Sequence, residues 1–89
     1  MIAVDAARVS RLKFRAWHRG TREADYIVGG FFDAYHAAWS EKEFEWFEAL
    51  LERDDADVLA WAMGKEEPPS QHSGTMMEAM QRLDYVSIR

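Results

Sequence analysis

The chain has 89 residues, which suits one hydrophobic core and is too short for two ordinary domains. Nearly half of the residues are apolar and no long polar low-complexity run occurs, which excludes intrinsic disorder. The absence of cysteine excludes disulfides and thiolate metal sites, and no apolar run reaches the roughly 18 residues that a membrane helix needs. We therefore expect residues 1–89 to form a single soluble, intracellular domain.

The net charge of −5 conceals an uneven distribution along the chain. Residues 1–22 contain six Lys or Arg and one acid, whereas residues 23–89 contain five bases and fifteen acids. Such a separation either steers the approach of a charged partner or leaves a solvated basic helix beside solvated acidic helices. The overall acidity argues against nucleic-acid binding, because domains that bind phosphates are usually strongly basic.

The first two predicted helices cover about residues 5–19 and 21–39. Asp5 is expected to cap the first helix, and Gly20 stands where a left-handed residue would end it. Apolar residues at helical spacing predict one buried face on each helix, with Phe14 and Trp17 near the first. These faces are Val9, Leu12 and Ala16 on the first helix, and Ala24, Ile27, Val28, Phe31, Tyr35 and Ala38 on the second.

Two consecutive glycines, Gly29 and Gly30, fall inside the second helix, where each costs about 1 kcal/mol relative to alanine. Such glycines permit close backbone approach, so they indicate either a helix crossing inside the bundle or a groove for a partner. A helical wheel places Gly29 on a polar stripe that includes Asp33 and His36. These last two residues lie one turn apart, and we expect an exposed ion pair rather than half of a catalytic site.

The third helix is predicted to follow Ser40, because Ser40 and Glu43 match a capping box. Asp54 or Asp55 should cap a short fourth helix that ends at Gly64. The apolar residues of these helices are Phe44, Phe47, Leu51, Val58, Leu59, Trp61 and Ala62. We expect most of them to be buried against the second helix.

A loop at about residues 65–74 precedes the last predicted helix, at about residues 75–84. Thr75 and Glu78 match a second capping box at its start. Its apolar residues are Met76, Met77, Met80 and Leu83. Five helices, no strand and short connections predict an all-α fold, a small five-helix bundle.

The sequence offers little support for catalysis or for a metal site. The glycine pair in VGGFF lacks the preceding strand that dinucleotide binding requires, and His18, His36 and His72 lack zinc-ligand spacing. Ser40 is better explained as a helix cap than as a nucleophile. The stretch RVSRLKFRAWHRG mixes basic and aromatic residues, so nucleic-acid binding stays a weaker alternative.

Three segments follow one another in the chain: RLKFRAWHRGTREAD, GGFFDAY and EFEWFEALLERDDADVLAWAMG. Together they resemble the succinate dehydrogenase assembly factor family, also called FAD assembly factors, over about residues 8–64. The Arg-Gly-x-x-Glu motif of this family is matched by Arg19, Gly20 and Glu23, and the acid two residues later by Asp25. Its Asp-x-Asp…Trp…Gly element is matched by Asp55, Asp57, Trp61 and Gly64.

The resemblance implies a small helical protein that is not itself an enzyme. Members of the family bind the flavoprotein subunit of succinate dehydrogenase, and in some bacteria that of fumarate reductase, and promote covalent attachment of FAD to a histidine there. The chemistry belongs to the flavin and the target, and the factor favours one conformation of that target by binding it better. The resemblance thus implies no stably bound cofactor. Because the family core begins within about ten residues of Met1, we expect a bacterial cytoplasmic protein, as a monomer.

The motif and its position at a helix break define the predicted partner-binding residues: Arg15, Trp17, His18, Arg19, Gly20, Glu23 and Asp25. We expect Arg19 and Glu23 to reach outward from a convex corner, with Gly20 leaving room for the backbone of the partner. Two alternatives are an interaction adaptor unrelated to flavin and a carrier that binds free FAD near Trp17 and Tyr26.

Overall fold

The computed structural model of the protein describes residues 5–86, and all regular structure in this range is helical, as predicted. The five α-helices are α1 (Ala6–Trp17), α2 (Arg22–Tyr35), α3 (Glu41–Leu51), α4 (Asp55–Ala62) and α5 (Thr75–Gln81). Single turns of 3-10 helix lie at His36–Ala38 and Ser70–His72. In the described part of the chain, no helix combines the length and the apolar character needed to cross a membrane.

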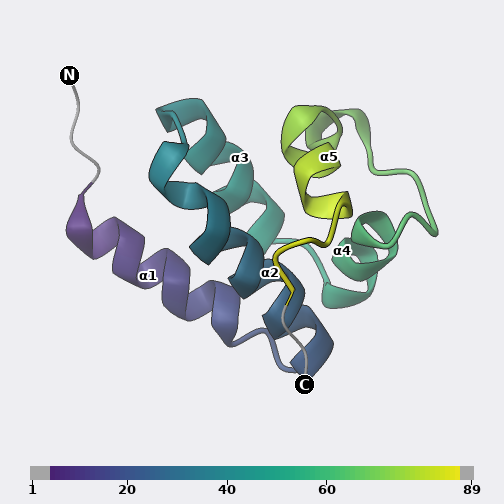
Figure 1. Cartoon of the computed structure of the whole chain (residues 1–89), viewed down its shortest axis with the longest axis horizontal. Coiled ribbons are helices and arrows are strands. Elements are labelled where there is room, and N and C mark those ends of the chain that lie inside the picture. The colour runs from purple at the N-terminus through teal and green to yellow at the C-terminus, as the bar shows by residue number, and fades with distance from the viewer. Residues whose placement is uncertain (1–4, 87–89) are drawn as a thin grey trace.

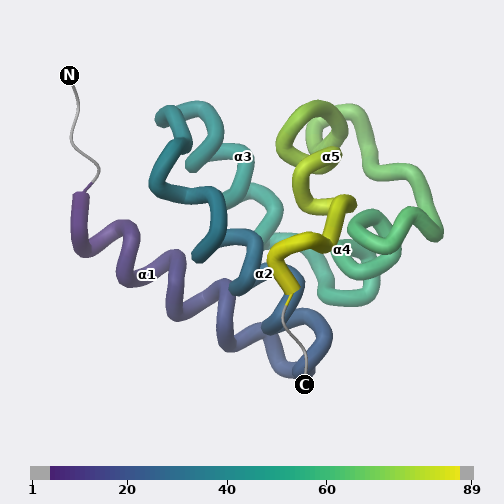
Figure 2. Tube along the Cα trace, in the orientation of Figure 1, coloured from purple at the N-terminus to yellow at the C-terminus, as the bar shows by residue number. Residues whose placement is uncertain are grey.

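Helix α2 lies at the centre of the arrangement. It packs along α1 and also contacts α4, while α1 reaches α3 and α4 contacts α5 (Figure 1). The segment after α5 then turns back across α2 (Figure 2). Its Tyr85 ring lies against Gly30, where an added Cβ would be 3.2 Å from Cδ1 of Tyr85. The second glycine of the pair therefore makes room for the C-terminal segment.

The first glycine of the pair, Gly29, marks the crossing of α1 and α2. It is buried, and any side chain there would overlap the indole of Trp17. The predicted helix crossing is thus confirmed, whereas the predicted place of Gly29 on a polar stripe is wrong. Asp33 does not pair with His36 either. Its carboxylate accepts from Nζ of Lys13 and from Nε1 of Trp17, each at 3.1 Å.

The core holds every residue expected from the third and fourth helices except Leu59, which is half-buried. Phe31, Phe32 and Phe47 are fully buried, and the ring of Phe47 lies 6.3 Å from that of Phe31 and 5.4 Å from that of Phe32. The buried apolar residues are Leu12, Ala16, Ala24, Ile27, Val28, Phe31, Phe32, Phe44, Phe47, Leu50, Leu51, Val58, Trp61, Ala62, Met76, Met77 and Met80. Burial of such side chains is the main favourable contribution to folding.

Capping at the helix starts follows the sequence in two of the expected places. Asp5 accepts from the backbone N–H of Ala7 at 3.0 Å, and Ser40 and Glu43 form the reciprocal capping box. The second expected box is wrong, because α5 is capped one residue earlier than Thr75, by Gly74. Gly74 has a φ of 111° and no side chain to accept a hydrogen bond.

Helix α2 is shorter than the predicted range of 21–39. The α-helix ends at Tyr35 and tightens into the 3-10 turn His36–Ala38, after which Trp39 is extended. This change of direction lets Ser40 start α3, and it leaves Ala38 exposed instead of buried as expected. Trp39 instead places its ring 5.1 Å from that of Phe47.

Several basic residues of the first helix form ion pairs with acidic residues of the same chain. Arg8 of α1 donates to Glu41 at 2.7 Å and to Glu48 at 2.8 Å, and Arg15 donates to Glu52 at 2.6 Å. Hydrogen bonds to Glu48 and Glu41 raise the pKa of Arg8, and the bond from Arg8 lowers the pKa of Glu41. The basic first helix therefore matches the acidic face of α3. Ion pairs near the surface are screened by solvent, so these pairs orient the helices more than they stabilise them.

Candidate functional site

Two turns of the chain meet at one corner of the molecule. Residues 18–21 join α1 to α2, and residues 52–54 join α3 to α4. We call these two turns, with the first turn of α2 and Asp55, the corner. The corner contains the Arg-Gly-x-x-Glu motif, so its geometry decides what each motif residue does.

The side chain of Arg19 joins the two turns. Its Nε donates to Oδ1 of Asp55 at 2.8 Å, Nη1 to the carbonyl of Leu51 at 2.7 Å, and Nη2 to the carbonyl of Arg53 at 2.6 Å. Leu51 is the last residue of α3, whose final carbonyls lack intrahelical donors. A guanidinium there satisfies those carbonyls and complements the negative end of the helix dipole. Asp55 opens α4, where an acid is also favoured.

The expectation that Arg19 reaches outward is therefore wrong. Its side chain is only 9% exposed, and that of Asp55 is 28% exposed. The planar fork of an arginine can bond a carboxylate and two carbonyls at once, which a lysine ammonium cannot reproduce in this geometry. Arg19 thus acts as a clamp between the α1–α2 turn and the α3–α4 turn.

Asp25 and Gly20 complete the turn around the backbone of Arg19. Oδ1 of Asp25 accepts from the Arg19 N–H at 2.6 Å. Gly20 has a φ of +119°, as the predicted need for a left-handed glycine implies, although it lies two residues beyond the cap of α1 at His18. A Cβ at Gly20 would meet nothing closer than Oδ2 of Asp55 at 3.9 Å. The backbone conformation, rather than crowding within the chain, is what requires glycine here.

Glu23 differs from Arg19 in having no partner within residues 5–86. It is exposed in the first turn of α2, and no ion pair or hydrogen bond of its side chain exists among the described residues. The cap of α2 is supplied instead by Thr21, whose hydroxyl accepts from the N–H of Ala24 at 3.2 Å. The Glu23 carboxylate therefore gains from the positive helix end and remains available to a partner.

The other predicted partner-binding residues lie in or next to this corner and differ in their exposure and in their contacts. Trp17 is half-buried on Gly29, and its ring is edge-on to Tyr26 at 6.2 Å. His18 is exposed and stacks on Phe14 at 4.0 Å, with Nδ1 2.7 Å from the carbonyl of Phe14. Arg15 is exposed and paired with Glu52. The structure thus brings all seven residues to one end of α1 and α2.

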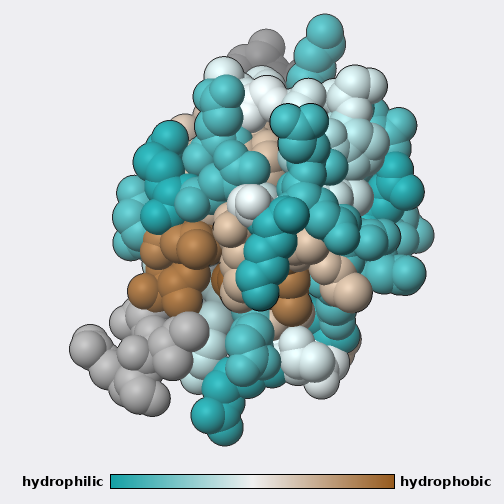
Figure 3. All heavy atoms as spheres, turned by 90° about the vertical axis from the view of Figure 1, so that its right-hand side faces the viewer, coloured by the Kyte–Doolittle hydropathy of each residue, from teal (hydrophilic) through white to brown (hydrophobic). Residues whose placement is uncertain are grey.

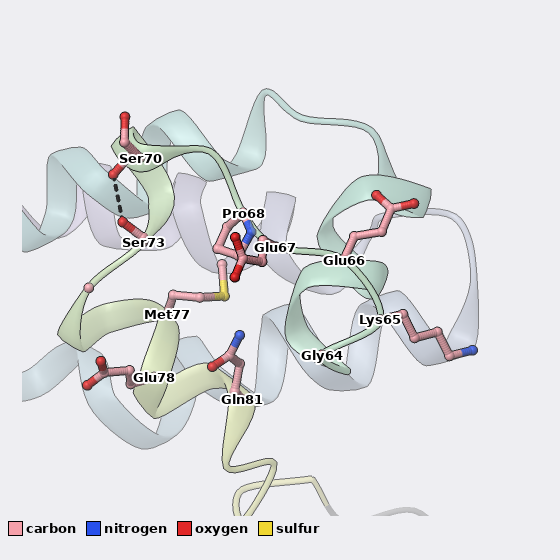
Figure 4. Close-up of a pocket in the computed structure, with 11 residues that line it drawn as sticks. Gly64, Lys65, Glu66, Glu67, Pro68, Ser70, Ser73, Met77, Glu78 and Gln81 are labelled. Carbon is pink, nitrogen blue, oxygen red and sulfur yellow. Dashed lines mark hydrogen bonds between the residues drawn. The ribbon is translucent and has the colours of Figure 1, made fainter.

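Shallow hollows flank the corner, and a larger hollow lies elsewhere. A hollow of about 520 Å³ borders Trp17, Gly20 and Tyr26. The larger one, about 660 Å³, lies between the loop after α4 and helix α5 (Figure 4). Figure 4 shows Lys65 and Glu66 pointing away from Met77, and none of the motif residues lines this hollow. We assign the candidate site to the corner.

Sequence reasoning identified Asp55 as part of a motif but not as the partner of Arg19. The two residues are 36 positions apart, and no spacing rule connects them. The sequence cannot show that the carbonyls of Leu51 and Arg53 accept hydrogen bonds from Arg19, because every residue carries a backbone carbonyl. Only the three-dimensional packing of the two turns reveals the clamp.

These features define a class: a small all-α domain with a clamped polar corner and exposed acids on it, among them Glu23. Within residues 5–86, no three or more His, Asp or Glu side chains gather as metal ligands. The chain belongs to the family described as "Flavinator of succinate dehydrogenase", whose model matches residues 10–84. The match continues past residue 64, where the recognisable motifs end, and includes α5.

Relatives with curated names agree with this family. A protein of Aliivibrio fischeri named "FAD assembly factor SdhE" is 39% identical over 84 residues, which cover 94% of this chain and 96% of the relative. One of the same name from Acetobacter pasteurianus is 39% identical over 75 residues, covering 84% and 69%. "Succinate dehydrogenase assembly factor 2, mitochondrial" of Schizosaccharomyces japonicus is 32% identical over 60 residues, covering 67% and 42%. No solved structure matches the chain.

Proposed function

We propose that this protein is an assembly factor that binds the flavoprotein subunit of succinate dehydrogenase and promotes covalent attachment of FAD to it. The observation that carries the proposal is the family match over residues 10–84, which includes the motif at the corner. The exposed carboxylate of Glu23 and the open surface at Gly20 support it, because both are accessible to another protein.

The corner supports a role in binding rather than in catalysis. Arg19 and Asp25 are occupied by contacts within the chain, whereas the Glu23 carboxylate is exposed and makes no ion pair or hydrogen bond within residues 5–86. We therefore propose that the attachment chemistry belongs to FAD and the target subunit, and that this protein holds no cofactor of its own stably. Preferential binding to one conformation of the subunit would raise the population of that conformation.

Three finer points belong to the same proposal. We extend the target to the related flavoprotein subunit of fumarate reductase, and we propose that the factor acts as a monomer in the bacterial cytoplasm. The similarity to the bacterial relatives supports the compartment. The absence of cysteine is consistent with a reducing compartment.

Reconstitution from purified components tests the proposal. The apo flavoprotein subunit is incubated with FAD, with and without this protein, then denatured and examined by in-gel flavin fluorescence. We expect covalent flavin to accumulate much faster with the protein present. Equal covalent flavin in both reactions would contradict the proposal. Yellow colour and quenched tryptophan fluorescence on addition of FAD alone would favour a flavin carrier instead.

A further inference from the structure

Helix α4 carries apolar residues on two opposite faces. Val58, Trp61 and Ala62 are buried in the core. On the other side, the outer residues are Ala56, Leu59 and Ala60 of the helix and Met63, which caps its end. Their spacing of i, i+3, i+4 and i+7 is that of a single helical stripe. Leu59 also packs against the core, but Ala56 and Met63 are exposed where a surface helix normally carries polar residues.

The outer stripe forms a hollow with the start of α2. The hollow has a volume of about 380 Å³ and is lined by Thr21, Glu23, Ala56, Leu59, Ala60, Met63 and Lys65. Met63 is 43% exposed, and it is one of two large apolar side chains exposed in the described part of the chain. Most of the surrounding side of the molecule, formed by α4, α5 and their loop, is hydrophilic (Figure 3). An exposed apolar strip with a polar rim is typical of a protein interface.

The position of the hollow connects it to the motif. Glu23 forms part of its wall, and Asp55, held by Arg19, is the first residue of α4. The Arg19 clamp therefore fixes the outer stripe of α4 relative to the Glu23 carboxylate. We call the hollow and its lining residues the α4 groove.

We propose that the α4 groove receives an apolar side chain of the flavoprotein subunit, and that a basic residue beside this side chain pairs with Glu23. The inference rests on the proposed function and adds the chemistry of the partner segment. The small side chains of Ala56 and Ala60 allow close approach, and Met63 adapts its shape to what enters. Glu23 has no ion pair within residues 5–86, so it can meet a cation without first losing another contact.

A second copy of this chain is a less suitable occupant. The outer stripe covers about two helical turns, or roughly 12 Å. Obligate homodimers commonly bury roughly 2,000 Å² or more in total, which requires a much longer apolar surface. The groove instead matches a single anchoring side chain at the centre of a larger interface, as binding hot spots commonly are.

Two variants test the groove, with one matched control. Ala56→Trp fills the groove from an exposed position, and Met63→Ser removes its flexible apolar wall. Ala38→Trp adds the same side chain at an exposed alanine beyond the other end of α2. Affinity for the purified apo flavoprotein subunit is measured by calorimetry, and melting temperature is measured for each variant.

We expect Ala56→Trp and Met63→Ser to weaken binding tenfold or more while melting within a few degrees of wild type. Ala38→Trp should bind normally. We also expect Glu23→Gln to weaken binding, by a factor that shrinks as salt is added, because salt screens the pair with the basic residue.

The outcomes separate this inference from the proposed function. If wild-type protein binds the subunit and Ala56→Trp binds equally well, the groove inference is overturned and the proposed function stands. If the wild-type protein neither binds the subunit nor promotes flavinylation, both the groove inference and the proposed function are overturned. Sedimentation of the wild type as a dimer that Ala56→Trp dissociates would identify a homodimer surface and overturn the inference.

Discussion

The two ends of helix α4 are held by opposite kinds of contact. At its start, Asp55 belongs to the polar clamp of Arg19. Near its end, the ring of Trp61 lies 5.5 Å from that of His72, and the guanidinium of Arg53 lies over the Trp61 ring at 5.9 Å. We call Trp46, Arg53, Trp61 and His72 the His72 cluster. The clamp uses ions and backbone carbonyls, whereas the cluster uses aromatic packing.

Arg53 belongs to both regions. Its carbonyl accepts from Arg19, and its Nε donates to Nε2 of His72 at 3.2 Å. The clamp therefore positions a motif that a partner can reach, and the cluster fastens the loop after α4 to the same turn. The comparison shows that charged residues of one sequence motif can have different tasks. Some, such as Arg19, hold the fold of a surface, and others, such as Glu23, are exposed on that surface. The predictions below separate these tasks.

The largest expected effect comes from the core that both regions share. Phe47→Ala should destabilise the protein by about 3–5 kcal/mol, because it leaves a cavity among buried aromatic rings. This is comparable to the whole stability of a small domain, so clamp and cluster should be lost together. The loss of stability is measured by urea unfolding, monitored by circular dichroism. A wild-type unfolding midpoint would contradict the assigned packing of α3 on α2.

A smaller loss should follow when only the clamp is removed. Arg19→Ala should cost about 2–3 kcal/mol, because it strands the carbonyls of Leu51 and Arg53 and leaves Asp55 without its ion pair. Arg19→Lys should recover part of this stability but not all, since lysine lacks the fork. The measurement is the urea midpoint of both variants. If Arg19→Ala unfolds like wild type, the clamp contributes nothing to the fold.

The sequence predicted Arg19 as a site residue but not its task or its partners in the clamp. Both Arg19 and Glu23 were expected to point outward, because two charged residues flanking a glycine at a helix break normally face solvent. The expectation failed for Arg19, because the C-terminal carbonyls of α3 lie within its reach. Such carbonyls carry no signature in a sequence, whereas an N-terminal cap such as Ser40 does.

The helices themselves were largely predictable. Apolar spacing identified the core of α3 and α4, and Asp5 and Ser40 marked two helix starts correctly. The end of α2 was missed, since a change from α-helix to a 3-10 turn depends on the tertiary position of Trp39. The His72 cluster was missed because its four residues come from distant parts of the chain.

Gly20 offers a test of the turn within the clamp. Gly20→Ala should cost about 1–2 kcal/mol, because a side chain disfavours positive φ. Gly20→Asn should restore little, since asparagine tolerates φ near about +57° rather than the observed +119°. Melting temperatures of the two variants provide the measurement. Wild-type stability for Gly20→Ala would show that the turn relaxes without strain.

A pH-dependent effect should report on the His72 cluster alone. Burial, followed by the nearby charge of Arg53, lowers the pKa of His72 below its ordinary value of 6.5. As pH falls, His72 therefore takes up a proton more readily in the unfolded chain than in the folded protein. The contribution of His72 to the free energy of unfolding is fully present above about pH 6.5 and declines below it. Urea midpoints at pH 7.5 and pH 5.5 measure this decline.

Two histidine variants make the pH test specific. His72→Phe should remove the difference between the two pH values that is due to this residue, while His18→Gln, at an exposed position outside the His72 cluster, should keep that difference. An unchanged pH dependence in His72→Phe would assign the effect to other groups and leave the His72 cluster without a titrating member.

The smallest effect on stability, and the most direct test of the account, is expected for Glu23. The central claim is that Arg19 holds the corner while Glu23 faces the partner. Glu23→Gln should change stability by no more than about 0.3–1 kcal/mol, the size of its interaction with the helix end. The decisive measurement is covalent flavin formed on the purified apo subunit per folded molecule of Glu23→Gln. The account predicts wild-type folding with strongly reduced covalent flavin, and normal covalent flavin would contradict it.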